Sequence, residues 1–192
     1  KLVHLKIGHA GTLDPLATGL LIICTGKKTK EISSFQDLPK EYTGTFFIGA
    51  TTPCYDKEKE VDEIFPTEHI TEELVLETAK SFIGKQEQVP PMFSAVKVDG
   101  KRLYKLARIG EEIELKARPI EILEFEITRC KLPLVDFRIA CTKGTYIRSI
   151  ARDFGLALNS GAYLDALCRT KIGHFSIEDA KTPEEFITEN PY

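Results

Sequence analysis

The chain has 192 residues, of which 42% are hydrophobic and 29% charged, and its net charge is −3. These values are typical of a globular protein that can bury a core without disulfides or metal, so a mainly disordered chain is excluded. The longest apolar run, residues 20–24, is far too short to cross a bilayer, and the opening residues do not resemble a secretory leader. We therefore expect one domain, no membrane contact and a cytoplasmic location.

The cysteines show no metal-binding or disulfide pattern. Their number is odd, no pair has C-x-x-C spacing, and the four histidines are scattered. We interpret them as reduced structural thiols and expect no metal, with a zinc site or a disulfide framework as the alternatives. The five are Cys24, Cys54, Cys130, Cys141 and Cys168.

Charge is segregated along the chain despite the small net value. Basic segments that converge on one face would hold a polyanion, but ordinary solvated charge explains the same pattern. Three basic segments alternate with three acidic ones: basic 1–30, 97–108 and 129–152, acidic 56–77, 111–126 and the tail from residue 178.

The first half of the chain predicts short elements between loops. A glycine-rich loop over residues 8–19 precedes an apolar strand, 20–24, and aromatic and β-branched residues predict a strand over 42–48. Thr71 is a candidate N-cap for a helix that Gly84 ends. Beyond the turn sequence Asp99-Gly100, residues 101–108 predict a short helix.

The second half predicts longer elements. Strands are expected over 120–127, 134–141 and 162–172, a helix over 147–158 that ends near 159–161, and a short helix capped by Thr182. Strands and helices do not alternate regularly. This order favours an α+β fold in which helices flank a mixed, mostly antiparallel sheet.

Residues 8–19, with the sequence G-H-A-G-T-L-D-P-L-A-T-G, are the most informative segment. Their glycines allow tight turns and close approach to a ligand. Asp14 stands between apolar residues, where a carboxylate resists ionisation unless a cation lies nearby. An isolated Asp-Pro is more often a turn, and neither phosphate-loop pattern matches. The residues alone thus indicate a candidate catalytic carboxylate.

This segment closely resembles the catalytic motif G-H-x-G-x-L-D-P-x-A-x-G of the TruB family of tRNA pseudouridine synthases. Further segments resemble family motifs in the same order, so that the resemblance spans residues 7–175: Lys40-Glu41-Tyr42, residues 90–108, residues 143–148 and residues 161–169. It implies a pseudouridine synthase catalytic fold and an enzyme that isomerises the uridine at position 55, in the T-loop of tRNA. It also implies no cofactor and no obligate protein partner, and we expect a monomer.

The sequence departs from the family pattern in three places. The family's D-K-P-x-G-x-T-S block does not precede the motif, and we expect residues 1–192 to form a single catalytic domain without a full C-terminal PUA-type domain. Residues 52–56 are T-P-C-Y-D where the family tends toward T-D-T-x-D. The family's L-R-R is Leu167-Cys168-Arg169 here, which removes one possible phosphate contact.

By motif position, the resemblance assigns the catalytic roles to Asp14, Tyr42 and Arg148. An ionised Asp14 needs a counter-ion, and the always-charged, planar guanidinium of Arg148 suits a carboxylate, so we predict that the two side chains pair. Tyr42 would stack on the flipped uracil or assist proton transfer from C5. Taken alone, Tyr42 would be a core residue and Arg148 a solvated helix charge.

Further positions are candidates for binding the RNA. Tyr42, Tyr146 and Leu167 would line the uracil, and His9 would help to hold the rearranged loop. As alternatives, Tyr146 and Leu167 are ordinary core and His9 caps a loop. Basic side chains are candidates for phosphate contacts: Lys97, Lys101, Arg102, Arg108, Lys143 and Arg152.

Three other functions are compatible with parts of the sequence. A non-catalytic tRNA-binding module or tRNA chaperone would share the fold, and a guide-RNA-dependent pseudouridine synthase would share the motifs. A carboxylate hydrolase would need a second acid, and Asp153 and Asp165 have no motif support for that role.

Overall fold

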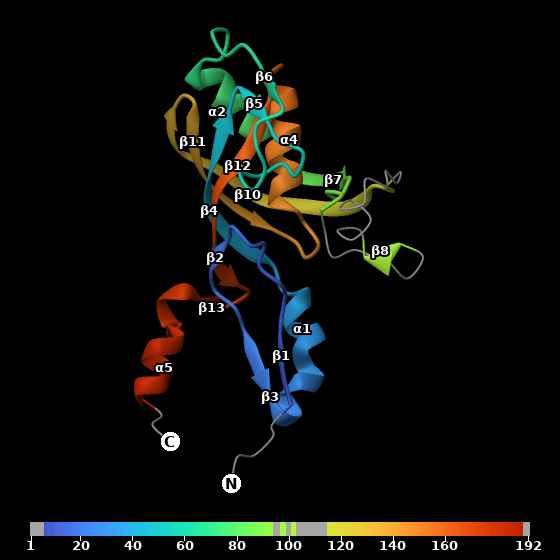
Figure 1. The fold of residues 1–192 in the computed structure, drawn as a ribbon, viewed down its shortest axis with the longest axis vertical. Helices are drawn as coiled ribbons and strands as arrows, with labels where there is room; N and C mark the ends of the chain where they lie inside the picture. The colour runs from blue at the N-terminus through green and yellow to red at the C-terminus, as the bar shows by residue number, and fades with distance from the viewer. Residues whose placement is uncertain (1–5, 94–96, 99–100, 103–114, 190–192) are drawn as a thin grey trace.

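A computed structural model describes residues 6–93, 97–98, 101–102 and 115–189. Its centre is a seven-stranded sheet (Figure 1), in which every pairing is antiparallel except that of β2 with β12. The mixed, mostly antiparallel sheet predicted from the sequence is therefore confirmed. The strands lie in the order β13 (Phe175–Ser176), β12 (Ala162–Ile172), β4 (Lys40–Ile48), β11 (Leu134–Cys141), β10 (Arg118–Lys131) and β7 (Gly84–Gln88), with β2 (Thr18–Gly19) beside β12.

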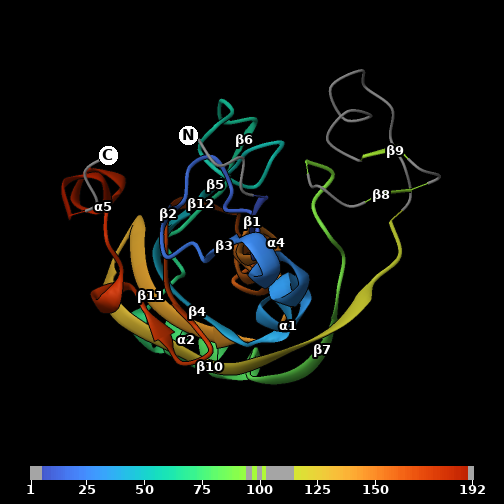
Figure 2. The same ribbon diagram turned by 90° about the horizontal axis from the view of Figure 1, so that it is seen from below.

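Two helices, α2 (Glu72–Ser81) and α4 (Ile147–Ala157), pack on one face of this sheet. Seen from below, the sheet curves around α4 (Figure 2). Strand β11 alternates buried and half-buried residues, as expected for a strand with one face in the core. At the centre of the core, the Phe46 ring stacks on Phe137 with centroids 4.2 Å apart and lies 5.5 Å from that of Phe154 in α4.

The helix ends follow the local sequence signals. The Thr71 side chain accepts a hydrogen bond from the backbone N–H of Leu74 at 3.2 Å, which confirms the predicted N-cap of α2. Helix α4 ends where Asn159 adopts a left-handed backbone with φ of 51°. Thr182 likewise accepts from the backbone N–H of Glu185 and caps α5 (Pro183–Glu189).

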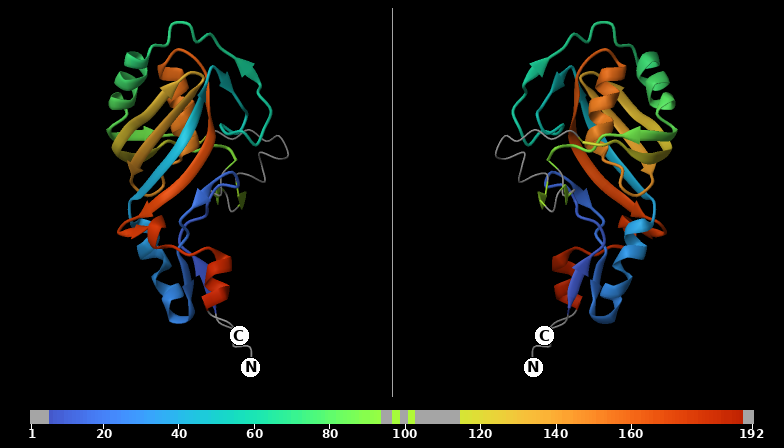
Figure 3. Two further views of the ribbon diagram at one scale, coloured as in Figure 1. Left: turned by 90° about the vertical axis from the view of Figure 1, so that its left-hand side faces the viewer. Right: turned by 90° about the vertical axis from the view of Figure 1, so that its right-hand side faces the viewer.

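A smaller lobe lies below the sheet (Figures 1 and 3). The antiparallel pair β1 (Ile7–His9) and β3 (Ile23–Thr25) packs beside η1 (Gly26–Glu31) and α1 (Ile32–Asp37), with η2 (Ile177–Asp179) and α5 toward the same end. The buried ammonium of Lys40 donates to the carbonyls of Gln36 and Leu38, at the end of α1. These bonds join the lobe to the first residue of β4.

Some local predictions were wrong. Residues 8–19 are not all loop, because β1 and β2 occupy their ends, and the strand predicted over 20–24 lies instead at β3. Lys101–Arg102 form strand β9, paired with β8 (Lys97–Val98), rather than the start of a helix; residues 103–108 lie outside the described residues. Each of these strands exists through pairing with a neighbour, which local propensity does not register. Another such pair is β5 (Ala50–Thr51) with β6 (Glu63–Ile64).

Among the described residues, no helix is long and apolar enough to span a bilayer. Within that same part of the chain, no group of three or more His, Cys, Asp or Glu side chains could hold a metal ion. The five cysteines are all free thiols.

Candidate active site

The loop that carries Asp14 runs from β1 to β3, and its second arm lies along β12. Gly19 in β2 pairs with Arg169 and has a φ of 103°. A Cβ at Gly19 would lie 2.4 Å from the carbonyl oxygen of Arg169, so only glycine allows this approach. The glycine at this position thus brings the Asp14 loop directly against the sheet.

Asp14 pairs with Arg148 of α4, as predicted. Nε and Nη2 of Arg148 each donate to one carboxylate oxygen of Asp14 at 2.9 Å, a bidentate arrangement that fixes both groups. The Arg148 side chain is 4% exposed, whereas that of Asp14 is 31% exposed. The arginine is therefore a buried support, and the carboxylate faces outward from it.

A second carboxylate lies behind the first. Asp56 is 1% exposed, and its Oδ2 lies 3.5 Å from Nε of Arg148. Its Oδ1 accepts from the Cys54 thiol at 2.9 Å and from the backbone N–H of Glu58 at 3.0 Å. Asp56 was not predicted from the sequence. The available signal was that residues 52–56 keep the final aspartate of the family's T-D-T-x-D.

Arg148 is fixed on its other side by the backbone. Its Nη1 donates to the carbonyl of Cys54 at 3.2 Å and its Nη2 to that of Phe93 at 2.9 Å. Burial and the hydrogen bond to Asp56 raise the pKa of the Cys54 thiol, so the thiol stays neutral and donates. The guanidinium thus holds a single orientation toward Asp14.

A cavity of about 100 Å³ opens beside Asp14. Of the residues predicted to bind the base, Tyr42, Tyr146 and Leu167 line it, while His9 does not. The other lining residues are Thr12, Leu13, Asp14, Ala17, Thr145, Ile147 and Arg169. The cavity therefore combines apolar walls with one carboxylate, two phenols and a guanidinium, the type of site that orients a small planar group.

Tyr42 presents a neutral hydroxyl at this cavity. Burial raises the pKa of its phenol to about 12, and a hydrogen bond with Arg169 offsets part of that rise. Tyr42 and Arg169 are direct partners across the β4–β12 pair. At neutral pH the side chain is thus a hydrogen-bonding phenol rather than a phenolate.

Arg169 is a further residue whose role the sequence did not reveal. It is 2% exposed, and its Nε and Nη2 donate to the carbonyls of Leu20 at 2.8 Å and Gly11 at 3.1 Å. The L-R-R motif suggested phosphate contacts for this segment. The guanidinium instead points into the protein.

Of the remaining predicted residues, those that the structure describes are not among the residues that line this cavity. His9 is exposed on β1 opposite Ile23. Lys143 pairs with Asp37 at 2.8 Å, and Arg152 pairs with Asp153 at 2.7 Å. Lys97, Lys101 and Arg102 belong to the β8–β9 pair, and Arg108 lies outside the described residues.

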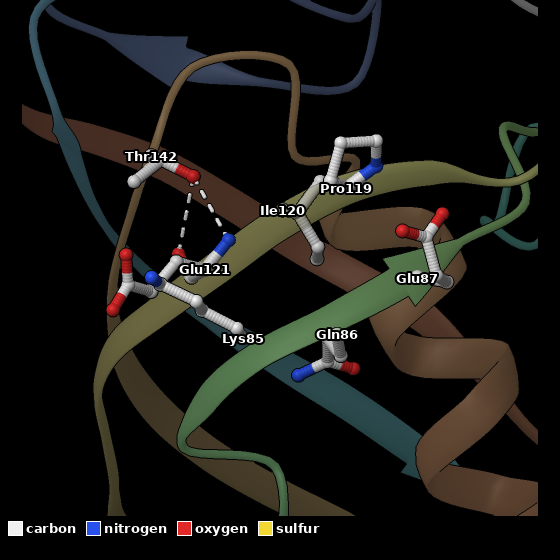
Figure 4. A pocket seen from close by; sticks show the side chains of 7 residues that line it. All are labelled: Lys85, Gln86, Glu87, Pro119, Ile120, Glu121 and Thr142. Carbon is white, nitrogen blue, oxygen red and sulfur yellow. Dashed lines mark hydrogen bonds between the residues drawn. The ribbon is translucent and has the colours of Figure 1, made fainter.

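A larger hollow of about 500 Å³ lies over β7 and β10 (Figure 4). Among its side chains, the Thr142 hydroxyl is bonded to the backbone of Glu121. It contains none of the predicted site residues, so we place the chemistry in the smaller cavity. The hollow is lined by Lys85, Gln86, Glu87, Pro119, Ile120, Glu121 and Thr142.

Comparison with solved structures identifies the class of the fold. A chain in the crystal structure of a Cbf5-Nop10-Gar1 complex superposes with a TM-score of 0.66 at 29% identity, over 89% of this chain and 41% of that one. A chain in the structure of an H/ACA RNP bound to a substrate RNA containing 2'-deoxyuridine has the same fold, with a TM-score of 0.63 at 24% identity, over 89% and 40%. The predicted α+β fold, that of a pseudouridine synthase catalytic domain, is confirmed.

Sequence comparison identifies the family within that class. Residues 1–147 match the family described as "TruB family pseudouridylate synthase (N terminal domain)". The chain belongs to the TruB family.

Several relatives carry the same name. A tRNA pseudouridine synthase B of Flavobacterium johnsoniae is 64% identical over 91% of this chain and 76% of its own length. One of Phocaeicola vulgatus is 59% identical over 95% and 77%, and one of Parabacteroides distasonis is 54% identical over 99% and 82%.

Proposed function

We propose that this chain is a tRNA pseudouridine synthase that isomerises the T-loop uridine at position 55, with Asp14 as the reacting carboxylate. The observation that carries the proposal is the bidentate Asp14–Arg148 pair at the edge of a cavity, in a chain whose relatives are named tRNA pseudouridine synthase B. A buried arginine that donates to both oxygens of a partly exposed carboxylate fixes the orientation of that carboxylate toward a bound base.

The reaction is balanced within one nucleotide. The N1–C1′ bond of the uridine breaks, the base turns, and a C5–C1′ bond forms. The proton on C5 leaves and N1 gains one, so the reaction needs no redox cofactor. Asp14 acts at the junction of base and sugar, as nucleophile or as electrostatic partner.

The target base must leave the RNA stack, at a cost of about a few kcal/mol. Stacking on Tyr42 recovers about 1–3 kcal/mol of this. Its neutral hydroxyl lines the same cavity, and we assign to it a role in proton transfer from C5. Tyr146 and Leu167 line the cavity, and we assign to them the packing against the base.

The RNA around the flipped base is held by shape and by phosphate contacts. We assign the loop contact to His9, which is exposed at the start of the Asp14 loop. The phosphate contacts are assigned to basic side chains: Lys97, Lys101, Arg102, Arg108, Lys143 and Arg152. We further propose that residues 1–192 act as a single catalytic domain, as a monomer and in the cytoplasm.

The test uses an unmodified tRNA transcript tritiated at uracil C5, with purified protein and no guide RNA or added protein. The wild-type chain should release tritium, and replacing the T-loop uridine should abolish release. Asp14→Asn should release none, while the matched control Asp179→Asn, an exposed acid in η2, should match the wild type. Tight tRNA binding without release by the wild type would contradict the proposal and favour a binding module or chaperone. Release only with a guide RNA would favour the guide-dependent class.

A further inference from the structure

Arg169 is a buried cation whose partners are unusual. Arg169 is 2% exposed, and none of the ion pairs found among the described residues includes it. Its hydrogen bonds go to the backbone carbonyls of Leu20 and Gly11. Burying an arginine without a counter-ion costs free energy, so its hydrogen bonds to the two carbonyls must offset that cost.

The two carbonyls belong to opposite arms of the Asp14 loop. Gly11 lies before Asp14 in the chain and Leu20 after it, so a single guanidinium bridges both arms. The backbone of Arg169 adds a third tie, because its carbonyl accepts from the N–H of Leu20 at 2.8 Å. The side chain and the main chain of one residue therefore close the base of the loop onto β12.

The same side chain also lies beside Tyr42. Arg169 is the register partner of Tyr42 across β4 and β12, and both side chains line the cavity that opens beside Asp14. One buried side chain thus holds the loop that carries Asp14 and neighbours the phenol of Tyr42. Since its Nε and Nη2 are committed to protein carbonyls, Arg169 is poorly placed to bind an RNA phosphate.

We propose that Arg169 is a positioning residue for the isomerisation: it clamps the two arms of the Asp14 loop and orients Tyr42, so that both groups meet the flipped base. This inference rests on the proposed function. Enzymatic groups act only within a narrow range of geometry, and a displacement of about 1 Å costs on the order of 100-fold in rate. A loop with three glycines has no rigidity of its own to hold that geometry.

The test compares Arg169→Met and Arg169→Lys with Arg129→Met, a matched control at an exposed arginine. We expect Arg169→Met to lower kcat for tritium release about 100-fold, with KM within about threefold of the wild type. Arg169→Lys should recover only part of the loss, because one amine does not span both carbonyls. Amide hydrogen exchange should show lost protection in residues 8–20 of Arg169→Met, with protection of α4 retained.

Several outcomes would overturn the proposal. An unchanged kcat in folded Arg169→Met would do so, as would a rise in KM of tenfold or more at unchanged kcat, which is the behaviour of an RNA contact. Loss of protection in α4 together with the loop would reduce Arg169 to a general structural residue. A failure of the wild-type chain to turn over would instead overturn the proposed function, while hydrogen exchange on the free protein would still test the clamp.

A second variant, Gly19→Ala, changes the loop instead of Arg169 and so leaves the guanidinium in place. Gly19→Ala places a Cβ 2.4 Å from the Arg169 carbonyl oxygen and forces the loop away from β12. It should show the same fall in kcat at nearly constant KM and the same local loss of protection. If Arg169→Met does not fold, Gly19→Ala decides the question, and normal turnover by Gly19→Ala would refute the clamp.

Discussion

The core beneath α2 and α4 and the loop around Asp14 are held by different forces. In the core, rings of Phe46, Phe125, Phe137 and Phe154 pack at centroid distances of 4.2–6.4 Å, and apolar burial supplies most of the stability. The Asp14 loop has small residues and a half-exposed carboxylate. Its position depends on directed hydrogen bonds from Arg148 and Arg169.

This difference predicts how each region responds to substitution. Apolar packing is non-directional, so a core change should lower the free energy of unfolding and leave the geometry of the surviving site intact. A hydrogen bond from a buried arginine instead fixes the direction of the group that accepts it. Its loss should therefore lower turnover first. It should lower stability only to the extent that another charge is left buried and unpaired.

Arg148→Met should have the largest effect, because Arg148 serves both stability and chemistry. It leaves Asp56 buried without its cation, which should lower the free energy of unfolding by about 3–5 kcal/mol, and tritium release should be lost. Urea unfolding and the tritium assay measure the two effects. The double variant Arg148→Met/Asp56→Asn should regain part of the stability and none of the turnover. Equal stability of the single and double variants would show that the stranded Asp56 charge is not the cause.

Phe154→Ala changes the core alone, so it should lower the stability of the protein and leave the Asp14 loop unaffected. Removing this fully buried ring should cost about 3–5 kcal/mol of unfolding free energy. In conditions where the variant is folded, kcat should stay within a small factor of the wild type. Phe186→Ala, at an exposed phenylalanine of α5, is the matched control and should cost far less. A large fall in kcat for folded Phe154→Ala would mean that core packing also sets the loop geometry.

Tyr42→Phe tests a residue that belongs to both regions, on a core strand and in the cavity. The ring remains for stacking, so RNA affinity should hold while turnover falls. Because the pKa of Tyr42 is raised to about 12, the phenol stays protonated, and the wild-type rate should show no inflection from Tyr42 between about pH 7 and 10. Tyr163→Phe, on the other face of the sheet, is the control. An inflection in this range that disappears in Tyr42→Phe would contradict the assignment of a neutral phenol.

Arg129→Met should have the smallest effect and concerns the solvent-facing side of the sheet. A hydrogen bond from Arg129 lowers the pKa of Asp136 below its usual range. A depressed folded-state pKa stabilises the protein above the ordinary pKa of aspartate, and that contribution is lost as the pH falls through the folded value. The wild type should therefore be slightly more stable than Arg129→Met at pH 7, and the difference should vanish in acid. Urea unfolding at several pH values measures this difference in stability. If the difference grows as the pH falls, the predicted direction of the pH dependence is wrong.

Local sequence patterns were sufficient to predict those elements that have one buried side and one more exposed side. Strands β11 and β12 were predicted with the bounds that they have, and α4 within one residue, because their alternation or helical spacing records which side is buried. The N-caps Thr71 and Thr182 are also local, since each acts on a backbone group three residues away. The pairing of Asp14 with Arg148 was predicted from family motifs together with the chemistry of a carboxylate and a guanidinium.

The main core strands, the helix α4, the family and the Asp14–Arg148 pair could thus be predicted from the amino-acid sequence. Three features became known only from the folded chain: Asp56 lies behind Arg148, Arg169 turns inward to Gly11 and Leu20, and β1 pairs with β3. Arg169 lies 158 residues from Gly11 in the chain, as Arg148 lies 134 residues from Asp14. The physical reason is that such contacts have no local periodicity: they arise where the folded sheet brings a buried charge and distant carbonyls or carboxylates within hydrogen-bond distance.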